Sequence, residues 1–411
     1  METRIAPHLR SSPEVARAEP ILRACVHCGF CNATCPTYQL LGDELDGPRG
    51  RIYQIKQVME GAAATRLTQQ HLDRCLTCRN CETTCPSGVQ YGELLDVGRT
   101  LVNAQVRRPL HERAVHALLR ETLTRRWLFG FALRLGRSVR FVLPASLRAK
   151  MGEARPAGDW PARTHARKVL LLRGCTQPAM LPSIDAATAR VLDAIGVQVV
   201  IASDAGCCGA IRQHLNDPSG AQHDIRRNID AWWPLIDSGT VEAIIINASG
   251  CAVTVKEYGH LLSDDPQYAD KARRIAACAK DLSEFMLPQV SALKSRLAAS
   301  SSKAVALQVP CTLQHGQKLG GALESLLRGL GVSLTPVAEP HLCCGSAGTY
   351  SLLQSELSYQ LRDRKLANLL CSEPTCVLSA NIGCISHLQT GTSVPVWHWI
   401  EWLDRALTTV K

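Results

Sequence analysis

The chain has 411 residues, of which 46% are hydrophobic and 19 are cysteines, and its formal net charge is +10. Its mean hydropathy of −0.02 excludes a disordered chain, because enough apolar residues are present to form ordinary cores. The sequence also excludes a membrane-spanning helix, since it holds no uninterrupted apolar run of about 18 residues.

The cysteines indicate ligand sites. Residues 1–20 hold no apolar segment of the kind that a secretory signal needs, so we expect a cytoplasmic, reducing environment. In such a compartment cysteines are more often metal ligands or redox groups than disulfides. All but three cysteines fall into four groups of four. The remaining three, which we expect to be structural, are Cys278, Cys371 and Cys376.

The first two groups lie in residues 15–100 and share the pattern C-x2-C-x2-C-x3-C-P, as CVHCGFCNATCP and CLTCRNCETTCP. Three thiolates at this spacing can surround one iron–sulfur cube, and in two-cluster ferredoxins the fourth cysteine ligates the other cluster. A zinc site is the alternative, but zinc gives no reason for the trailing C-P in both copies. We expect two [4Fe–4S] clusters, with cluster 1 on Cys25, Cys28, Cys31 and Cys85, and cluster 2 on Cys75, Cys78, Cys81 and Cys35.

A helix is predicted between the two quartets. The segment GPRGRIYQIKQVMEG places Pro48 at a helix start and Gly61 at its end. This helix favours an α-helical ferredoxin-type domain over residues 15–100. Arg49 and Arg51 at its start either supply positive charge near an anionic cluster or are ordinary solvated charges.

The positive charge is concentrated in one segment. Residues 101–150 contain ten Arg and one Lys against two Glu, so the remainder of the chain is close to neutral. This distribution argues against a nucleic-acid groove. We expect a basic helical connector over residues 101–160. Its stretch WLFGFALRLGRSVRFVL, with Arg134, Arg137 and Arg140, has three interpretations: a helix on an anionic membrane surface, a helix docked on an acidic partner, or a core-packing helix with a solvated arginine face.

An internal repeat follows the connector. Short apolar runs alternate with helical patterns, and each half contains a strand-like run before a cysteine, a Cys-Cys-Gly triplet and a final cysteine after an apolar run. The offset between the halves is 136 residues for the first three cysteines and 133 for the last. This order predicts a duplicated α/β unit, with half-domains at 161–300 and 301–411.

Each half-domain is predicted to place its four cysteines at one site. Two of the four in each half follow strand-like runs, and open α/β sheets bind ligands at the carboxyl ends of their strands. Such a set can hold a further cluster or metal, or carry dithiol chemistry, while some members could instead be buried small hydrophobic residues. The sets are Cys175, Cys207, Cys208 and Cys251 in the first half and Cys311, Cys343, Cys344 and Cys384 in the second.

The full set of motifs resembles the iron–sulfur subunits of flavin-dependent 2-hydroxyacid and glycerol-phosphate dehydrogenases. The segments TCPTYQLLGDELDGPRGRI, PCTLQHGQ and NASGCAVTVKEYGHLL bring the chain nearest to glycolate oxidase (glycolate dehydrogenase) iron–sulfur subunits. The resemblance implies an electron-transfer subunit, without catalytic residues of its own, in a complex that oxidises glycolate to glyoxylate. It further implies FAD on partner subunits only, a membrane quinone-type acceptor, and a peripheral position on the inner face of the cell membrane.

Two alternatives stay open at this point. One is the iron–sulfur subunit of a lactate or glycerol-3-phosphate dehydrogenase. The other is a thiol–disulfide reductase similar to heterodisulfide reductases, whose cysteine-rich halves end in a C-x-x-C pair. Here Ala248 and Asn381 occupy the first position of that pair, so we do not expect a five-cysteine noncubane cluster in either half. The chain also shows no dinucleotide or flavin motif of its own.

Overall fold

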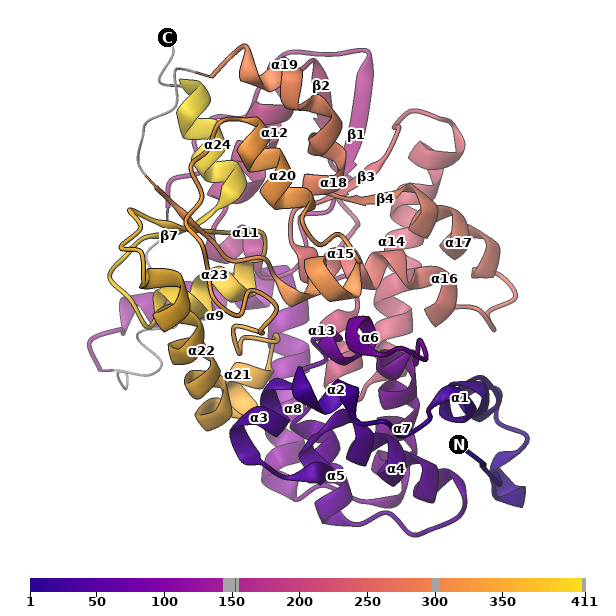
Figure 1. Ribbon diagram of the computed structural model, residues 1–411. Coiled ribbons are helices and arrows are strands. Elements are labelled where there is room, and N and C mark those ends of the chain that lie inside the picture. The colour runs from indigo at the N-terminus through magenta and orange to yellow at the C-terminus, as the bar shows by residue number, and fades with distance from the viewer. Residues whose placement is uncertain (143–151, 153–154, 298–303, 409–411) are drawn as a thin grey trace. The chain divides into compact units, whose positions relative to one another are not determined.

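The computed structural model describes residues 1–142, 152, 155–297 and 304–408 (Figure 1). The chain divides into two compact units. Unit 1 comprises Met1–His116 and His341–Leu361, and unit 2 comprises Ala117–Pro340 and Arg362–Lys411. Within the described residues, every helix is too short or too polar to cross a membrane.

Unit 1 is built from helices around a buried core of aliphatic side chains. Its principal contact is between α4 (Pro48–Met59) and α7 (Tyr91–Gln105), where Ile55 and Leu94 are fully buried. Gly98 permits this close approach, since a Cβ there would clash with Ile55. The other helical elements are η1 (Pro7–Leu9), α1 (Pro13–Ala24), α2 (Phe30–Ala33), α3 (Pro36–Leu41), η2 (Glu44–Asp46), α5 (Arg66–Asp73), α6 (Asn80–Thr84) and α21 (Tyr350–Leu353).

The helix predicted between the quartets is α4. It begins at Pro48, whose missing N–H costs nothing in the first turn, and it is followed by Gly61 with a φ of +102°. All regular structure described for residues 1–116 is helical, as an α-helical ferredoxin-type domain requires.

The basic connector forms two helices, α8 (Leu110–Thr124) and α9 (Arg126–Ser138). The boundary between the two units falls within α8, after His116. The rest of the predicted connector includes residues 143–151 and 153–154, which lie outside the described residues.

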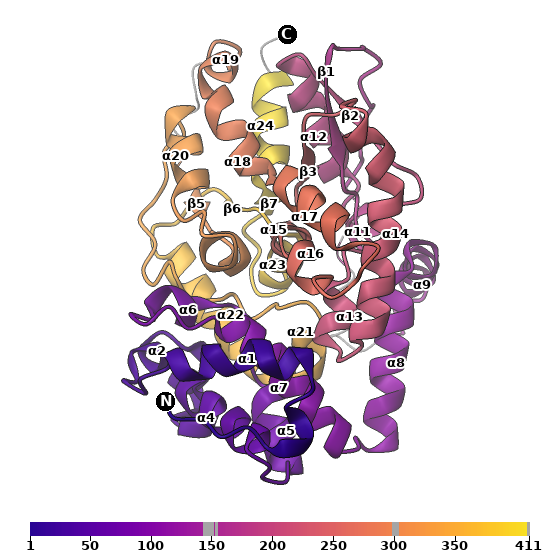
Figure 2. The same ribbon diagram turned by 90° about the vertical axis from the view of Figure 1, so that its right-hand side faces the viewer.

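Unit 2 contains two small parallel sheets with matching strand order. The first runs β2-β1-β3-β4, from β1 (Arg167–Leu171), β2 (Val197–Val200), β3 (Ile244–Ile246) and β4 (Ala279–Asp281). The second runs β5-β6-β7, from β5 (Ala306–Leu307), β6 (Val377–Ser379) and β7 (Val396–His398) (Figure 2). A parallel bridge from Val305 to Leu334 adds the position equivalent to β2. Equal order in both sheets is the result that a duplicated unit predicts.

Helices flank both sheets of unit 2. In the first half these are α11 (Gln177–Met180), α12 (Ser183–Ala194), α13 (Ala210–His214), α14 (Pro218–Asp237), α15 (Ser249–Lys256), α16 (Tyr258–Leu261), α17 (Ala269–Cys278), α18 (Leu282–Met286), η3 (Leu287–Gln289) and α19 (Val290–Lys294). In the second half they are the π-helix η4 (Thr312–Gly316), α20 (Ala322–Gly329), α22 (Ser355–Leu370), α23 (Ile382–Gln389) and α24 (Trp399–Thr408).

The two halves are joined through α12 and α24. The Arg190 guanidinium pairs with Asp404 at 2.7 Å, and the Ser183 hydroxyl donates to Glu401 at 2.6 Å. Below them His398 is fully buried and donates from Nε2 to the carbonyl oxygen of Asn247 at 2.8 Å. Burial lowers the pKa of His398 to about 3, so this hydrogen bond is made by a neutral ring.

The two compact units do not each contain one half of the repeat. Residues 341–361, which contain the second Cys-Cys-Gly triplet, belong to unit 1, whereas the rest of the second half belongs to unit 2. The repeated sequence therefore has two different surroundings for its two Cys-Cys-Gly triplets.

Candidate functional site

Unit 1 contains two hollows lined by cysteines. The first encloses about 420 Å³, partly open to solvent, and its cysteines are Cys25, Cys28, Cys31, Cys81 and Cys85. The second encloses about 300 Å³, and its cysteines are Cys35, Cys75, Cys78 and Cys81. Because at least four thiols line each hollow, each has the donors that a [4Fe–4S] cluster needs.

The backbone explains how each quartet surrounds its hollow. In the first loop His27 and Gly29 have φ of +58° and +85°, and in the second Thr77 and Arg79 have +52° and +60°. These left-handed residues stand at equivalent positions and turn the chain twice between the first and third cysteines. Arg79 adopts this conformation without being a glycine, at a cost of roughly 1–2 kcal/mol. Such strain persists where the surrounding structure imposes it, as it does at ligand-binding loops.

The fourth cysteine of each quartet leaves its own loop. Cys35 caps the N-terminus of α3, where Pro36 begins the helix, and lines the hollow of the second quartet. Cys85 ends α6, before Pro86, and lines the hollow of the first quartet. The two short helices therefore deliver each fourth thiol across to the other loop.

Burial disfavours the thiolate form of Cys31 and Cys81. Burial raises the pKa of Cys31 to about 11, and the neighbouring Cys25 and Cys85 thiols raise it further in the same direction. Burial, then Cys78 and Cys75, raises the pKa of Cys81 well above its usual value. Four converging sulfurs that repel one another as thiolates are suited to a cationic centre, which binds them deprotonated. The donor set thus fits an iron–sulfur cluster in each hollow.

One buried arginine accompanies the second hollow. Arg51 is 1% exposed, and its Nη1 donates to Thr37 Oγ1 at 3.2 Å. Thr37 Oγ1 lies 3.3 Å from Cys35 Sγ. Of the two interpretations that the sequence allowed, Arg51 is a charge beside the ligand site and not a solvated one. Arg49 lines the first hollow but is half-exposed and paired with Glu44 at 2.6 Å.

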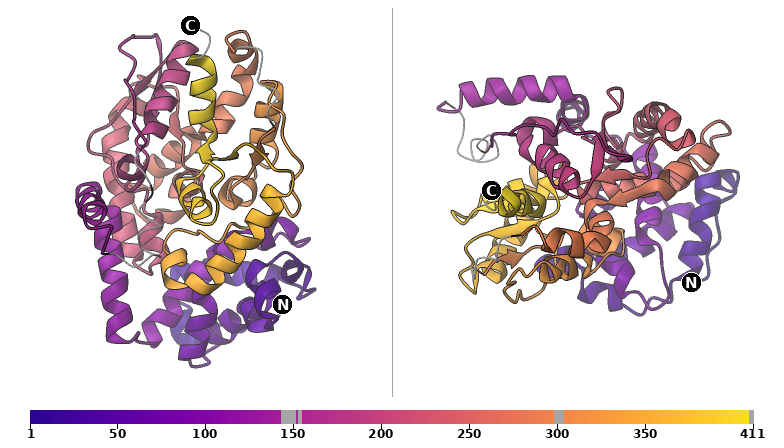
Figure 3. Two further views of the ribbon diagram at one scale, coloured as in Figure 1. Left: turned by 90° about the vertical axis from the view of Figure 1, so that its left-hand side faces the viewer. Right: turned by 90° about the horizontal axis from the view of Figure 1, so that it is seen from above.

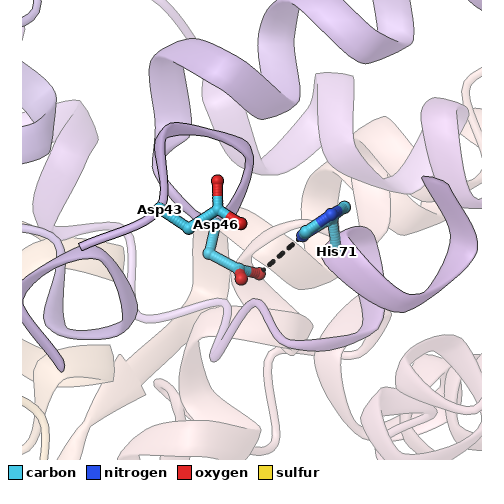
Figure 4. Close-up of side chains that lie close together, drawn as sticks. All are labelled: Asp43, Asp46 and His71. Carbon is cyan, nitrogen blue, oxygen red and sulfur yellow. Dashed lines mark ion pairs between the residues drawn. The ribbon is translucent and has the colours of Figure 1, made fainter. Parts of the chain in front are cut away.

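Asp46 anchors that arginine. Its carboxylate lies 3.4 Å from Arg51 Nη2, 2.8 Å from Arg74 Nη1 and 3.1 Å from His71 Nδ1. Figure 4 shows Asp46 and His71 facing each other with Asp43 beside them, a grouping that also resembles a cation site. Because two arginines already compensate Asp46, we assign the group to holding Arg51 and not to binding a metal.

In unit 2 the first cysteine set gathers at one place, with Cys175, Cys207 and Cys208 buried and Cys251 partly buried. Cys207 is within hydrogen-bond reach of both Cys175 and Cys208, and Cys208 is within reach of Cys251. Hydrogen bonds from Cys175 and Cys208 lower the pKa of Cys207 well below its usual value, assisted by the Gly209 amide and Arg227. The pKa of Cys175 is raised correspondingly. The set therefore favours the thiolate of Cys207 over those of Cys175 and Cys208.

Polar groups fix the Cys-Cys-Gly loop of this set. Asn228 Nδ2 donates to the Cys207 carbonyl at 2.7 Å, and the Tyr258 hydroxyl donates to the Cys208 carbonyl at 3.0 Å. Asp224 lies one turn before Asn228 in α14. Burial raises its pKa to about 6, and the nearby Cys207 raises it further. The loop is thus held by its backbone, which leaves the sulfurs to face one another.

Arginines surround this set, and the sequence did not reveal their role. Arg126, from α9, donates to the carbonyl oxygens of Gly174 at 3.1 Å and Ala205 at 3.3 Å, immediately before Cys175 and close before Cys207. Arg227 adds positive charge at Cys207. Arg126 belongs to the run of arginines in the connector, but nothing in its spacing distinguished it from the others.

The second cysteine set is divided between the units. Cys311 and Cys384 lie in unit 2, where Asn381 Nδ2 donates to Cys384 Sγ at 3.6 Å. Asn381 occupies the position that would hold the first cysteine of a C-x-x-C pair. Its side chain instead donates a hydrogen bond to the Cys384 sulfur. Cys343 and Cys344 lie in unit 1. The remaining cysteines differ in burial, with Cys371 exposed, Cys376 buried and Cys278 intermediate.

In unit 1 the second Cys-Cys-Gly triplet lies near the second hollow. Asn80, between two cysteines of that hollow, donates to the carbonyl oxygen of His341 at 3.3 Å. Burial raises the pKa of Tyr350, and the Cys75 and Cys343 thiols act in the same direction, so Tyr350 lies near both. The sequence offered no signal for this proximity.

Comparisons with known proteins agree with this architecture. Residues 21–89 match the family model of the 4Fe-4S dicluster domain, and residues 169–256 and 305–389 each match the model of the cysteine-rich domain. The fold and its sites therefore define an iron–sulfur protein with a dicluster domain followed by a duplicated cysteine-rich domain.

Individual relatives identify the family within this class of iron–sulfur proteins. The chain is 51% identical to the glycolate oxidase iron-sulfur subunit of Escherichia coli, over 99% of both chains. It is 30% identical to the probable glycolate oxidase iron-sulfur subunit of Bacillus subtilis, over 89% of this chain and 88% of that one. Lactate utilization protein A of Bacillus licheniformis is 28% identical over 54% of this chain and 90% of its own. The chain belongs to the family of glycolate oxidase iron–sulfur subunits.

Proposed function

We propose that this chain is the iron–sulfur electron-transfer subunit of a flavin-dependent glycolate dehydrogenase that converts glycolate to glyoxylate. The observation that carries the proposal is the pair of cysteine-lined hollows in unit 1, within a chain whose full length matches this family. Oxidation of a 2-hydroxyacid yields two electrons, so a flavin must accept them together and release them singly. We place that FAD, and the substrate, on partner subunits.

We assign the proposed ligands of each cluster from the cysteines that line each hollow. Cys25, Cys28, Cys31 and Cys85 would hold cluster 1, and Cys75, Cys78, Cys81 and Cys35 would hold cluster 2. When bound, a [4Fe–4S] cluster accepts and releases one electron at a time. The chain supplies the thiolates, limits access of water by burial, and places Arg51 and Thr37 beside Cys35.

We propose a further cluster or metal at the cysteine-rich domains. In the first half it would bind Cys175, Cys207, Cys208 and Cys251, which the structure gathers in unit 2. In the second half we retain Cys311, Cys343, Cys344 and Cys384 as the proposed ligands. Asn381 donates to Cys384 where a fifth cysteine would stand, so the family resemblance to disulfide reductases does not extend to a five-cysteine centre.

The proposed electron path leads from the flavin partners through the clusters to a quinone-type acceptor in the membrane. The chain would then lie peripherally on the inner face of the cell membrane. Substrate specificity would belong to the partner subunits, because oxidation of the hydroxyacid needs the flavin that we place there.

The test is reduction of the chain by substrate. The complex purified with FAD-containing subunits should show glycolate-dependent bleaching of its iron–sulfur absorption, and the same preparation should respond less to lactate or glycerol 3-phosphate. If the isolated chain, given an artificial electron donor, reduced a disulfide by itself, the proposal would give way to a thiol–disulfide reductase.

A further inference from the structure

Helix α9 presents a row of large apolar side chains to solvent. Trp127, Phe131 and Leu135 are 71%, 61% and 54% exposed and stand four residues apart, so they share one face of the helix. Phe141 and Val142, just beyond the helix, are 75% and 68% exposed. Single exposed apolar residues are ordinary, but a continuous row of this size marks a surface that binds something. These three side chains are therefore not part of the core, although the helix itself packs on unit 2 through Leu133.

The opposite face fixes the helix on unit 2. Leu133 is buried, and a Cβ at Gly130 would stand at van der Waals distance from Ala179 of α11. Arg126 holds the carbonyl oxygens of Gly174 and Ala205. Figure 3 shows α9 along the outer edge of unit 2, with one side free. The exposed row is therefore held outward by contacts of the inner face.

The charges beside the row have one sign. From residue 125 to residue 142 the polar side chains are five arginines and Ser138, without a carboxylate. Arg134 and Arg140 are exposed beside the apolar row, while Arg137 is half-buried. A protein interface usually has a polar rim with donors and acceptors on both sides. A surface of cations and apolar groups alone complements the anionic headgroups and the underlying hydrocarbon of a lipid bilayer.

We propose that the outer face of α9 binds an anionic lipid surface, with Trp127, Phe131 and Leu135 in the acyl boundary and Arg134 and Arg140 among the headgroups. Arg126 connects the same helix to the loops of Cys175 and Cys207. Because Arg126 contacts both loops, lipid binding by α9 would bring the first cysteine set, as the redox site of unit 2, close to the membrane. This last step rests on the proposed electron-transfer function, whereas lipid binding does not.

The experiment measures sedimentation of the full chain, with its clusters reconstituted, on vesicles of phosphatidylcholine with or without phosphatidylglycerol. We expect binding only to the anionic vesicles, weakening with added salt. The double variant Arg134→Gln/Arg140→Gln should bind about 25-fold more weakly, at about fivefold for each arginine. The triple variant Trp127→Ser/Phe131→Ser/Leu135→Ser should lose more than about tenfold. The matched control Leu41→Ser/Leu67→Ser, which removes exposed apolar side chains of unit 1, should bind as the unaltered chain does.

Unaltered iron content and far-UV circular dichroism would show that each variant is folded. The proposal is overturned if the unaltered chain does not sediment, if neutral vesicles bind it equally, or if both α9 variants bind as the control does. Loss of FAD subunits from the α9 variants with vesicle binding intact would assign the face to a protein partner instead. A complex that fails to bleach with glycolate would overturn the proposed function and leave the vesicle result unaffected.

Discussion

The hydroxyl of Thr34 lies 3.1 Å from the hydroxyl of Thr84, and the two threonines are equivalent residues of the two quartets. Each immediately precedes the fourth cysteine of its pattern, Cys35 or Cys85. This hydrogen bond brings equivalent positions of the two loops together. This meeting places each fourth cysteine beside the three cysteines of the other loop, as the exchange of ligands between clusters demands.

The exchange predicts the effect of single ligand substitutions. Cys85→Ser should remove the cluster of the first hollow, although Cys85 belongs to the second sequence motif, because Cys85 lines that hollow. Electron paramagnetic resonance of the reduced protein should lose the signal of cluster 1, and Cys35→Ser should remove the signal of cluster 2. Cys371→Ser, at an exposed cysteine, is the control and should retain both. Loss of the same signal from Cys85→Ser and Cys75→Ser would show that each motif keeps its own four ligands.

Arg51 should raise the reduction potential of cluster 2. Replacing it by Gln removes a buried positive charge beside Cys35, so addition of an electron becomes less favourable. We expect the midpoint potential to fall by tens of millivolts, where about 59 mV corresponds to a tenfold change for one electron. Redox titration followed by paramagnetic resonance measures the shift. Arg49→Gln, in the first hollow, should leave cluster 2 unchanged; an equal effect of both variants on cluster 2 would contradict this assignment.

The second Cys-Cys-Gly turn should tolerate no side chain at its glycine. Gly345 has a φ of +83°, and a Cβ there would clash with the carbonyl oxygen of Ser358. Gly345→Ala should therefore lower the free energy of unfolding by about 2–4 kcal/mol, the sum of left-handed strain and overpacking. Gly348→Ala is the matched control, because Gly348 also has a positive φ, +61°, but open space around its Cβ position. Thermal denaturation should rank the two; an equal loss would show that packing contributes nothing.

His398 should make the stability of unit 2 depend on pH. Its pKa is about 3 in the folded chain and roughly 6.5 when unfolded, so between these values the unfolded chain binds the additional proton. The stabilisation is complete above about pH 6.5 and is lost as the pH falls toward 3, at up to about 1.4 kcal/mol per pH unit. Urea denaturation at pH 7 and pH 5.5 should show a larger loss in the unaltered chain than in His398→Gln. Parallel losses would indicate that other groups carry the pH dependence.

The sequence alone determined which residues could act as ligands and the order of the domains. The quartets, the helix from Pro48 to Met59, and the repeat that becomes two parallel sheets all follow from local spacing. Spacing is informative for these features because a short loop, a helix start and a strand end are set by neighbouring residues. The cysteines of each quartet therefore line hollows that their pattern anticipated.

Only the tertiary structure decided the surroundings of those residues. Arg49 and Arg51 are two positions apart in one helix, yet Arg51 is buried on Asp46 while Arg49 is half-exposed. Arg126 and Arg134 belong to one basic run, yet the first holds the loop before Cys175 and the second faces solvent. Likewise, two Cys-Cys-Gly triplets of equal spacing belong to different compact units. The burial of a side chain and its interaction partners depend on residues that are distant in the chain but pack together. Local sequence patterns do not predict those contacts.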